Sequence, residues 1–144
     1  MLSVIDLPNR LPAFTSGEAA LSAGWISTAD LLTIPTTDDP MRLQGVVELL
    51  DTPLIKGDAR SGYRSVPVVV AYIRSPMRAI RQSPAVSAAL DRIRERVLDV
   101  VEIPKDERAT LAIVKGKPIT EIDPRLRSAY INLALAVARA LAEA

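Results

Sequence analysis

The sequence predicts a helix-rich α+β fold, and three observations lead to that prediction. The chain has 144 residues, 49% of them hydrophobic, which is enough to bury one core without disulfides or a structural metal. Prolines that directly follow Ser or Asp recur along the chain, as they do at the first turn of helices. Two long segments have apolar residues at helical spacing, and shorter β-branched apolar runs predict a small sheet.

The first segment of the chain is predicted to be an extended arm. Residues 1–14 include Pro8 and Pro12 and show no sustained helical or strand period. The remaining residues, 15–144, contain no internal repeat or low-complexity stretch, so we expect them to form one α+β domain. Because terminal segments are usually mobile unless something holds them, an ordered arm of this kind would dock onto a neighbouring surface.

Two short helices are predicted after the arm. Capping-box spacings that begin at Thr15 and Ser27 predict helices over 17–23 and 28–34, with Gly24 ending the first. Helix, glycine turn and helix make up a helix-turn-helix, so a DNA-binding role is an alternative for this region. The second predicted helix has no Arg or Lys, which a helix in the major groove usually needs.

A third helix is predicted to begin at Pro40, with Asp39 as its N-cap. Asp38 and Asp39 are also the one candidate carboxylate pair for a small hydrolase, although a helix cap explains them better. The chain has no His and no Cys, which excludes imidazole catalysis, thiolate catalysis and Cys/His zinc sites. We therefore expect no enzyme, and no catalytic, cofactor-binding or metal-binding residues.

The small sheet is predicted from two regions. Residues 66–73 are β-branched and aromatic, and the run is too uniformly apolar for an exposed strand. The second region, 109–122, has two apolar runs separated by the turn at 115–117, and it is predicted to add two short strands.

Two long helices are predicted to pack against each other. The first, over 84–101, begins with a Ser-Pro step and has apolar residues at alternating spacings of four and three. The second, over 124–143, begins with Asp123 as N-cap. A one-turn helix over 76–82 is predicted to precede the first long helix.

Arg74, Arg78 and Arg81 form the candidate anion-binding site. On a helix these spacings place the three side chains on one face, near a helix start where the macrodipole disfavours positive charge. Three surroundings stay open for this site: solvent alone, carboxylates of a protein partner, or nucleic-acid phosphates.

The predicted C-terminal helix is the candidate oligomer interface. Alanines surround its apolar stripe on nearly every other side, and a helix that is apolar all round is normally buried. A domain of this size has little core to surround such a helix, so we expect a second copy of the chain to cover part of it. The candidate interface residues are Leu126, Tyr130, Leu133, Val137 and Leu141.

Charge is segregated along the chain, although the net charge is only +1. Residues 1–55 have two basic and seven acidic side chains, whereas residues 56–96 have nine basic and three acidic ones. Complementary segments of this kind pair within one fold or between copies. A net charge near zero gives no general argument for nucleic acid, and no apolar stretch is long enough for a membrane span.

These observations together favour a non-enzymatic structural or assembly subunit that forms homo-oligomers, for example a virion or other particle component. The expected partners are copies of the same chain and other assembly subunits, without cofactor or membrane, in the cytoplasm or a virion. Nucleic acid is the less favoured partner. The alternative function is a DNA-binding transcriptional regulator with a helix-turn-helix-like N-terminal region.

Overall fold

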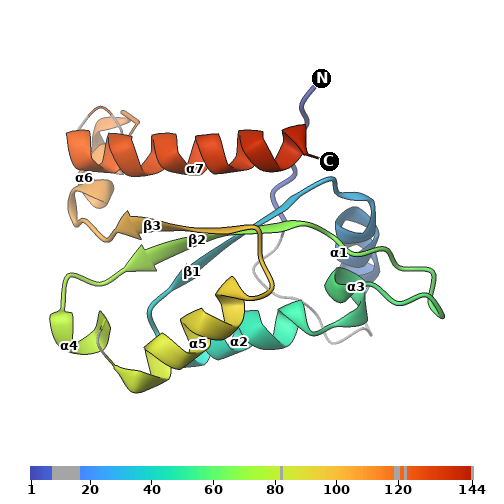
Figure 1. Ribbon diagram of the computed structural model, residues 1–144. Helices are drawn as coiled ribbons and strands as arrows, with labels where there is room; N and C mark the ends of the chain where they lie inside the picture. The colour runs from blue at the N-terminus through green and yellow to red at the C-terminus, as the bar shows by residue number, and fades with distance from the viewer. Residues whose placement is uncertain (8–16, 82, 119–120, 122, 144) are drawn as a thin grey trace.

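Three parallel strands form the centre of the fold in the computed structural model, which describes residues 1–7, 17–81, 83–118, 121 and 123–143. The strands are β1 (Leu32–Thr37), β2 (Val68–Arg74) and β3 (Asp99–Pro104), in the spatial order β1-β2-β3 (Figure 1). Leu32 lies opposite Val68, and Val69 lies opposite Asp99. Because parallel neighbours need crossover connections, the chain passes through helices between successive strands.

Helices cover both faces of this sheet. In Figure 1, α2 and α5 lie together below the sheet, and α7 lies above it. Among the helices of the described residues, none is both long and apolar enough to cross a membrane. The helices are α1 (Gly17–Thr28), α2 (Pro40–Leu50), α3 (Pro53–Lys56), α4 (Arg78–Arg81), α5 (Pro84–Arg94), α6 (Arg108–Lys115) and α7 (Pro124–Ala142).

The central strand β2 contributes to the core on both faces. Side chains alternate across a strand, so Val68, Val70 and Tyr72 pack with the buried residues of α2 and α5. Val69 and Ala71 point the other way and pack with α7. A strand with helices on both sides needs an unbroken apolar run, and this requirement explains why β2 lacks the polar alternation of an exposed strand.

Both outer edges of the sheet carry a proline. The amide of Leu32 donates to the carbonyl of Pro67, just before β2, so the amides of every second residue of β1 face inward and the nitrogen of Pro35 faces outward. On the opposite edge Lys105 donates to Arg74, which likewise leaves the nitrogen of Pro104 facing outward. A proline at this position removes a donor that an added strand would need.

The helix-rich α+β class is confirmed, and several predicted elements are present. The strand expected over 66–73 is β2, and the one-turn helix expected over 76–82 is α4. The last helix runs over Pro124–Ala142, close to the expected 124–143. Residues 8–14 of the expected arm lie outside the described residues, while residues 1–7 form neither helix nor strand.

The two short N-terminal helices were predicted wrongly. A single helix, α1, continues through Gly24 to Thr28, and the expected helix over 28–34 is replaced by β1. The sequence of β1, LTIPTT, is rich in β-branched residues, and pairing with β2 fixes it as a strand. The helix-turn-helix alternative therefore lacks its second helix.

Two further boundaries differ from the prediction. The helix expected over 84–101 ends at Arg94, and the chain then turns into β3. This helix, α5, was predicted to pack against the last helix, but α5 and α7 lie on opposite faces of the sheet (Figure 1). The strand expected at the start of 109–122 is the helix α6, while residues 119, 120 and 122 lie outside the described residues. The sheet consequently gains its second and third strands from β1 and β3 rather than from this region.

Candidate functional site

The carboxyl ends of the three strands are the first place to look for chemistry, because open α/β sheets usually bind ligands there. Polar residues follow each strand at this edge. Asp38 and Asp39 come after β1, Ser75 comes after β2, and Asp106 comes after β3. Their contacts decide whether any of them is available for a ligand.

The carboxylate pair after β1 is occupied by backbone amides. Asp39 is the N-cap of α2 and accepts a 2.9 Å hydrogen bond from the amide of Met41. Asp38 is buried and accepts a 2.6 Å hydrogen bond from the amide of Ser75. The pair therefore joins the end of β1 to α2 and to the end of β2, which favours the cap interpretation over a hydrolytic site.

The three candidate anion-binding arginines do not share one helix. Arg74 is the last residue of β2, whereas Arg78 and Arg81 are the first and last residues of α4, so the assumption of a single helix face was wrong. The guanidinium of Arg74 lies 3.3 Å from a carboxylate oxygen of Glu102 on β3. Arg94 lies 3.8 Å from the other oxygen of the same carboxylate. Arg74 thus has a carboxylate partner in its own chain.

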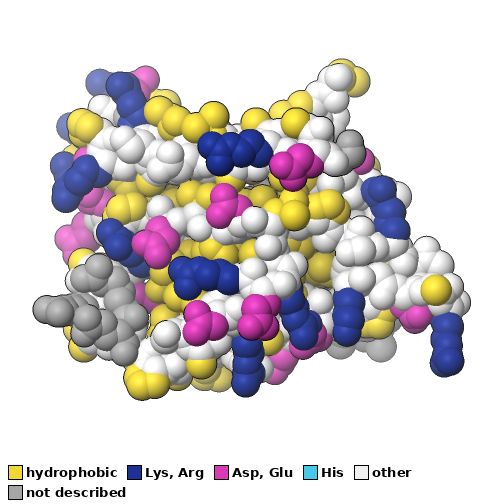
Figure 2. All heavy atoms as spheres, viewed as in Figure 1, with side chains coloured by type: hydrophobic (Ala, Val, Ile, Leu, Met, Phe, Trp, Pro, Cys, Tyr) yellow, Lys and Arg dark blue, Asp and Glu magenta, His cyan; other side chains and the backbone are white. Residues whose placement is uncertain are grey.

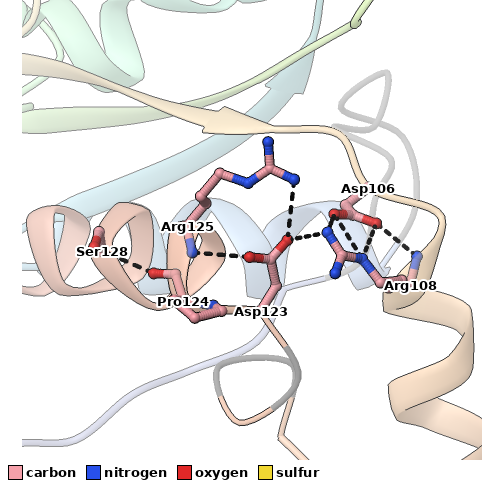
Figure 3. Close-up of polar contacts among 6 residues, drawn as sticks. All are labelled: Asp106, Arg108, Asp123, Pro124, Arg125 and Ser128. Atoms are coloured by element: carbon pink, nitrogen blue, oxygen red, sulfur yellow. Dashed lines mark hydrogen bonds and ion pairs between the residues drawn. The ribbon is translucent and has the colours of Figure 1, made fainter.

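Asp106, Arg108 and Asp123 form a charged clamp between the end of β3, α6 and α7 (Figure 3). Asp106 accepts hydrogen bonds from the Arg108 amide at 2.8 Å and from its guanidinium at 2.9 Å. The same guanidinium pairs with Asp123, which is only 3% exposed. Asp123 also accepts a 2.9 Å hydrogen bond from the amide of Arg125 as the N-cap of α7.

Within the clamp, Asp106 and Arg108 hold each other in their charged forms at neutral pH. Hydrogen bonds from the Arg108 side chain and amide lower the pKa of Asp106 from its usual 3.8 to about 2. The hydrogen bond to Asp106 in turn raises the pKa of Arg108. A carboxylate held in its charged form by an arginine is a poor general acid or base near pH 7.

This edge of the sheet is therefore built from groups that bind each other. Among the described residues, no buried side-chain nitrogen or oxygen lacks a hydrogen-bond partner. Those residues also hold no cluster of three or more His, Cys, Asp or Glu that would suit a metal ion. The clamp at this edge connects the starts of α6 and α7. These two helices carry exposed apolar side chains.

The predicted interface stripe on α7 faces the chain's own sheet. Leu126 is only 2% exposed and packs with Ala71 of β2 and Ile103 of β3. Tyr130 and Leu133 are half-buried against the same cluster. Val137 and Leu141 are also half-buried, so contact of this flank with a second chain stays a prediction.

A second apolar strip lies on the outward side of α7, which we call the outer seam. Figure 2 shows hydrophobic side chains along the side of α7 that faces away from the sheet. Ile131 and Leu135 are 51% and 48% exposed, and Ala138 and Ala142 continue the strip at spacings of three and four. The sequence-based prediction missed this seam, although its four-three-four spacing is visible in the sequence.

Helix α6 adds a second exposed apolar surface beside the start of α7. Only Ala112 of α6 is buried. Ile113 and Val114 are 81% and 78% exposed, and Leu111 is also exposed.

Comparisons of the chain with protein-family models, with curated proteins and with solved structures find no match.

Proposed function

We propose that this chain is a non-enzymatic assembly subunit that forms homo-oligomers through the outer seam of α7. The observation that supports this most directly is that α7 is apolar on two opposite sides. One side packs on β2 and β3, and the other presents Ile131 and Leu135 to solvent. A helix of this kind is normally covered on both sides, and the chain itself covers one.

A symmetric pair of α7 helices is the simplest arrangement that covers the seam. In a two-fold dimer the same surface meets itself, and spacings of four and three suit packing of one helix on another. An antiparallel pair also sets the positive end of one helix dipole beside the negative end of the other.

Burial of the two large seam side chains, Ile131 and Leu135, does not by itself provide enough free energy for a stable dimer. Ile131 and Leu135 are about half exposed, so covering each contributes about 1 kcal/mol, or about 4 kcal/mol for the pair of helices. Association costs about 4 kcal/mol or more in translational and rotational freedom. A stable dimer therefore needs other apolar surface beside the seam, and α6 supplies it.

Molar mass in solution tests this proposal. We expect light scattering on the wild-type chain to report a dimer or a larger oligomer at both low and high salt, because apolar contacts are not screened. Leu135→Asp should weaken self-association by at least about a hundredfold, because a charge would be buried without a partner. Added duplex DNA should leave the mass unchanged.

Met41→Asp is the matched control, because Met41 is exposed on α2, which lies on the other face of the sheet. This variant should keep the wild-type mass. Circular dichroism should show that both variants keep the wild-type helix content. A wild-type chain that stays monomeric at all concentrations would overturn the proposal, as would a Leu135→Asp variant with unchanged self-association.

A further inference from the structure

The described part of the N-terminal arm, residues 1–7, forms neither helix nor strand, and most of its side chains are exposed. Leu7 is half-buried and packs against the core, which fixes the base of the arm. Beyond it Leu2 and Val4 are 70% and 85% exposed, and Ile5 is about half exposed. These residues therefore include four large apolar side chains, Met1, Leu2, Val4 and Ile5, that the chain itself leaves about half or more exposed.

Helix α6 presents the matching surface at the other end of α7. The Arg108–Asp123 ion pair holds the start of α6 beside the start of α7. Figure 1 shows α6 at one end of α7, and the N-terminal end of the chain near the opposite end of that helix. With 19 residues, α7 separates the two surfaces by about 28 Å.

An antiparallel pair of α7 helices brings these two surfaces together. In such a pair the C-terminal end of one α7 lies over the N-terminal end of the other. The arm of each copy then emerges beside α6 of its partner, and the two-fold axis repeats the contact. An extended arm of six residues reaches about 20 Å from its base, which is enough to cross a two-turn helix.

The outer edges of the sheet are a poorer place for the arm. Strand addition needs a continuous row of backbone donors, and Pro35 and Pro104 interrupt that row on the two edges. Docking on α6 needs side-chain contacts alone.

We infer that the N-terminal arm of one copy docks on α6 of a second copy, with Leu2 and Val4 covering Ile113 and Val114. This inference rests on the proposed self-association through the outer seam. It assigns a partner to the two most exposed large apolar side chains of α6, and it gives the dimer the extra apolar contact that the seam requires.

Disulfide cross-linking tests the inference directly, because the chain has no native cysteine. Chains whose single substitution is Val4→Cys would be mixed with chains whose single substitution is Ile113→Cys, and the mixture would be oxidised. We expect about tenfold more cross-linked heterodimer than for Val4→Cys mixed with Met41→Cys, because docking raises the local thiol concentration. Met41 is the matched control because it is equally exposed and lies on the opposite face.

A second variant measures the contribution of the arm without cysteines. Leu2→Asp combined with Val4→Asp should weaken dimerisation by about tenfold or more, because two charges would enter an apolar contact. The fold should be unchanged, because Leu7 anchors the arm and stays in place.

The outcomes separate this inference from the proposed function. Selective cross-linking of the position 4 and position 113 variants supports it. A dimer that Leu135→Asp dissociates, but in which cross-linking is no better than in the control, overturns the arm inference and leaves the seam intact. A wild-type monomer overturns both.

Discussion

Asp123 is the residue whose substitution tests most sharply how α7 is held. Its carboxylate caps α7 through the amide of Arg125 and pairs with Arg108 while almost fully buried. Losing an N-cap costs about 1 kcal/mol. Losing a charged hydrogen bond costs about 2 kcal/mol more. We therefore expect Asp123→Ala to lower the free energy of unfolding by about 3 kcal/mol, a large share of a total of about 5–15 kcal/mol.

Asp123→Asn separates the two contributions. Asn is as good an N-cap as Asp, so this variant should lose the ion pair and keep the cap. We expect it to be more stable than Asp123→Ala by about 1 kcal/mol. Urea unfolding followed by the fluorescence of Trp25, the single tryptophan, measures both differences.

The result that would refute this reasoning is specific. An Asp123→Ala variant within about 0.5 kcal/mol of the wild type would behave like an ordinary surface substitution. In that case the clamp would not hold α7, and the account of how α6 and α7 are positioned would be wrong.

Three more predictions concern the rest of the fold. The pKa of Asp106 is about 2 in the folded chain, against an ordinary value of 3.8. Its contribution to stability is therefore present above about pH 4 and is lost as the pH falls to about 2. The acid unfolding of Asp106→Asn should depend less steeply on pH than that of the wild type. Gly57→Ala should destabilise more than Gly62→Ala in urea unfolding, because both glycines have positive φ but only at Gly57 would a Cβ lie 2.7 Å from backbone; equal losses would contradict this. Leu43 is fully buried, so Leu43→Ala should lower the free energy of unfolding by about 2–5 kcal/mol in the same assay. Met41 is exposed, so Met41→Ala should lower it by less than about 0.5 kcal/mol.

Local signals in the sequence correctly predicted where α2, α5 and α7 begin. Asp39 and Asp123 both accept a hydrogen bond from the second amide after them, as an N-cap before proline should. The strand near 66–73 was predicted from a β-branched run that is apolar on both faces, a pattern that a short buried helix can also show. These features depend on neighbours within a few residues.

The errors arose where pairing over long distances decides the structure. β1 is a strand because it pairs with β2, more than thirty residues away. The capping-box spacing that begins at Ser27, just before β1, favoured a helix instead. Val100 was predicted in a helix and lies in β3, yet it packs against the same core cluster as Val97. The apolar spacing correctly indicated that Val97 and Val100 face the core. Whether such a segment forms a helix or a strand depends on the strand with which it pairs.

Of the two roles that the sequence left open for its segregated charges, the structure shows pairing within one fold. Arg96 pairs with Asp51, so the basic middle of the chain meets its acidic first third within one molecule. Arg64 donates to the carbonyl of Ala29 after α1, and Arg74 pairs with Glu102. These contacts join elements distant in sequence and leave fewer complementary charges for a neighbour. Apolar side chains, by contrast, remain uncovered on the arm, α6 and the outer seam. An assembly of this chain should therefore depend on hydrophobic contact, with charge acting mainly to fix the fold that presents it.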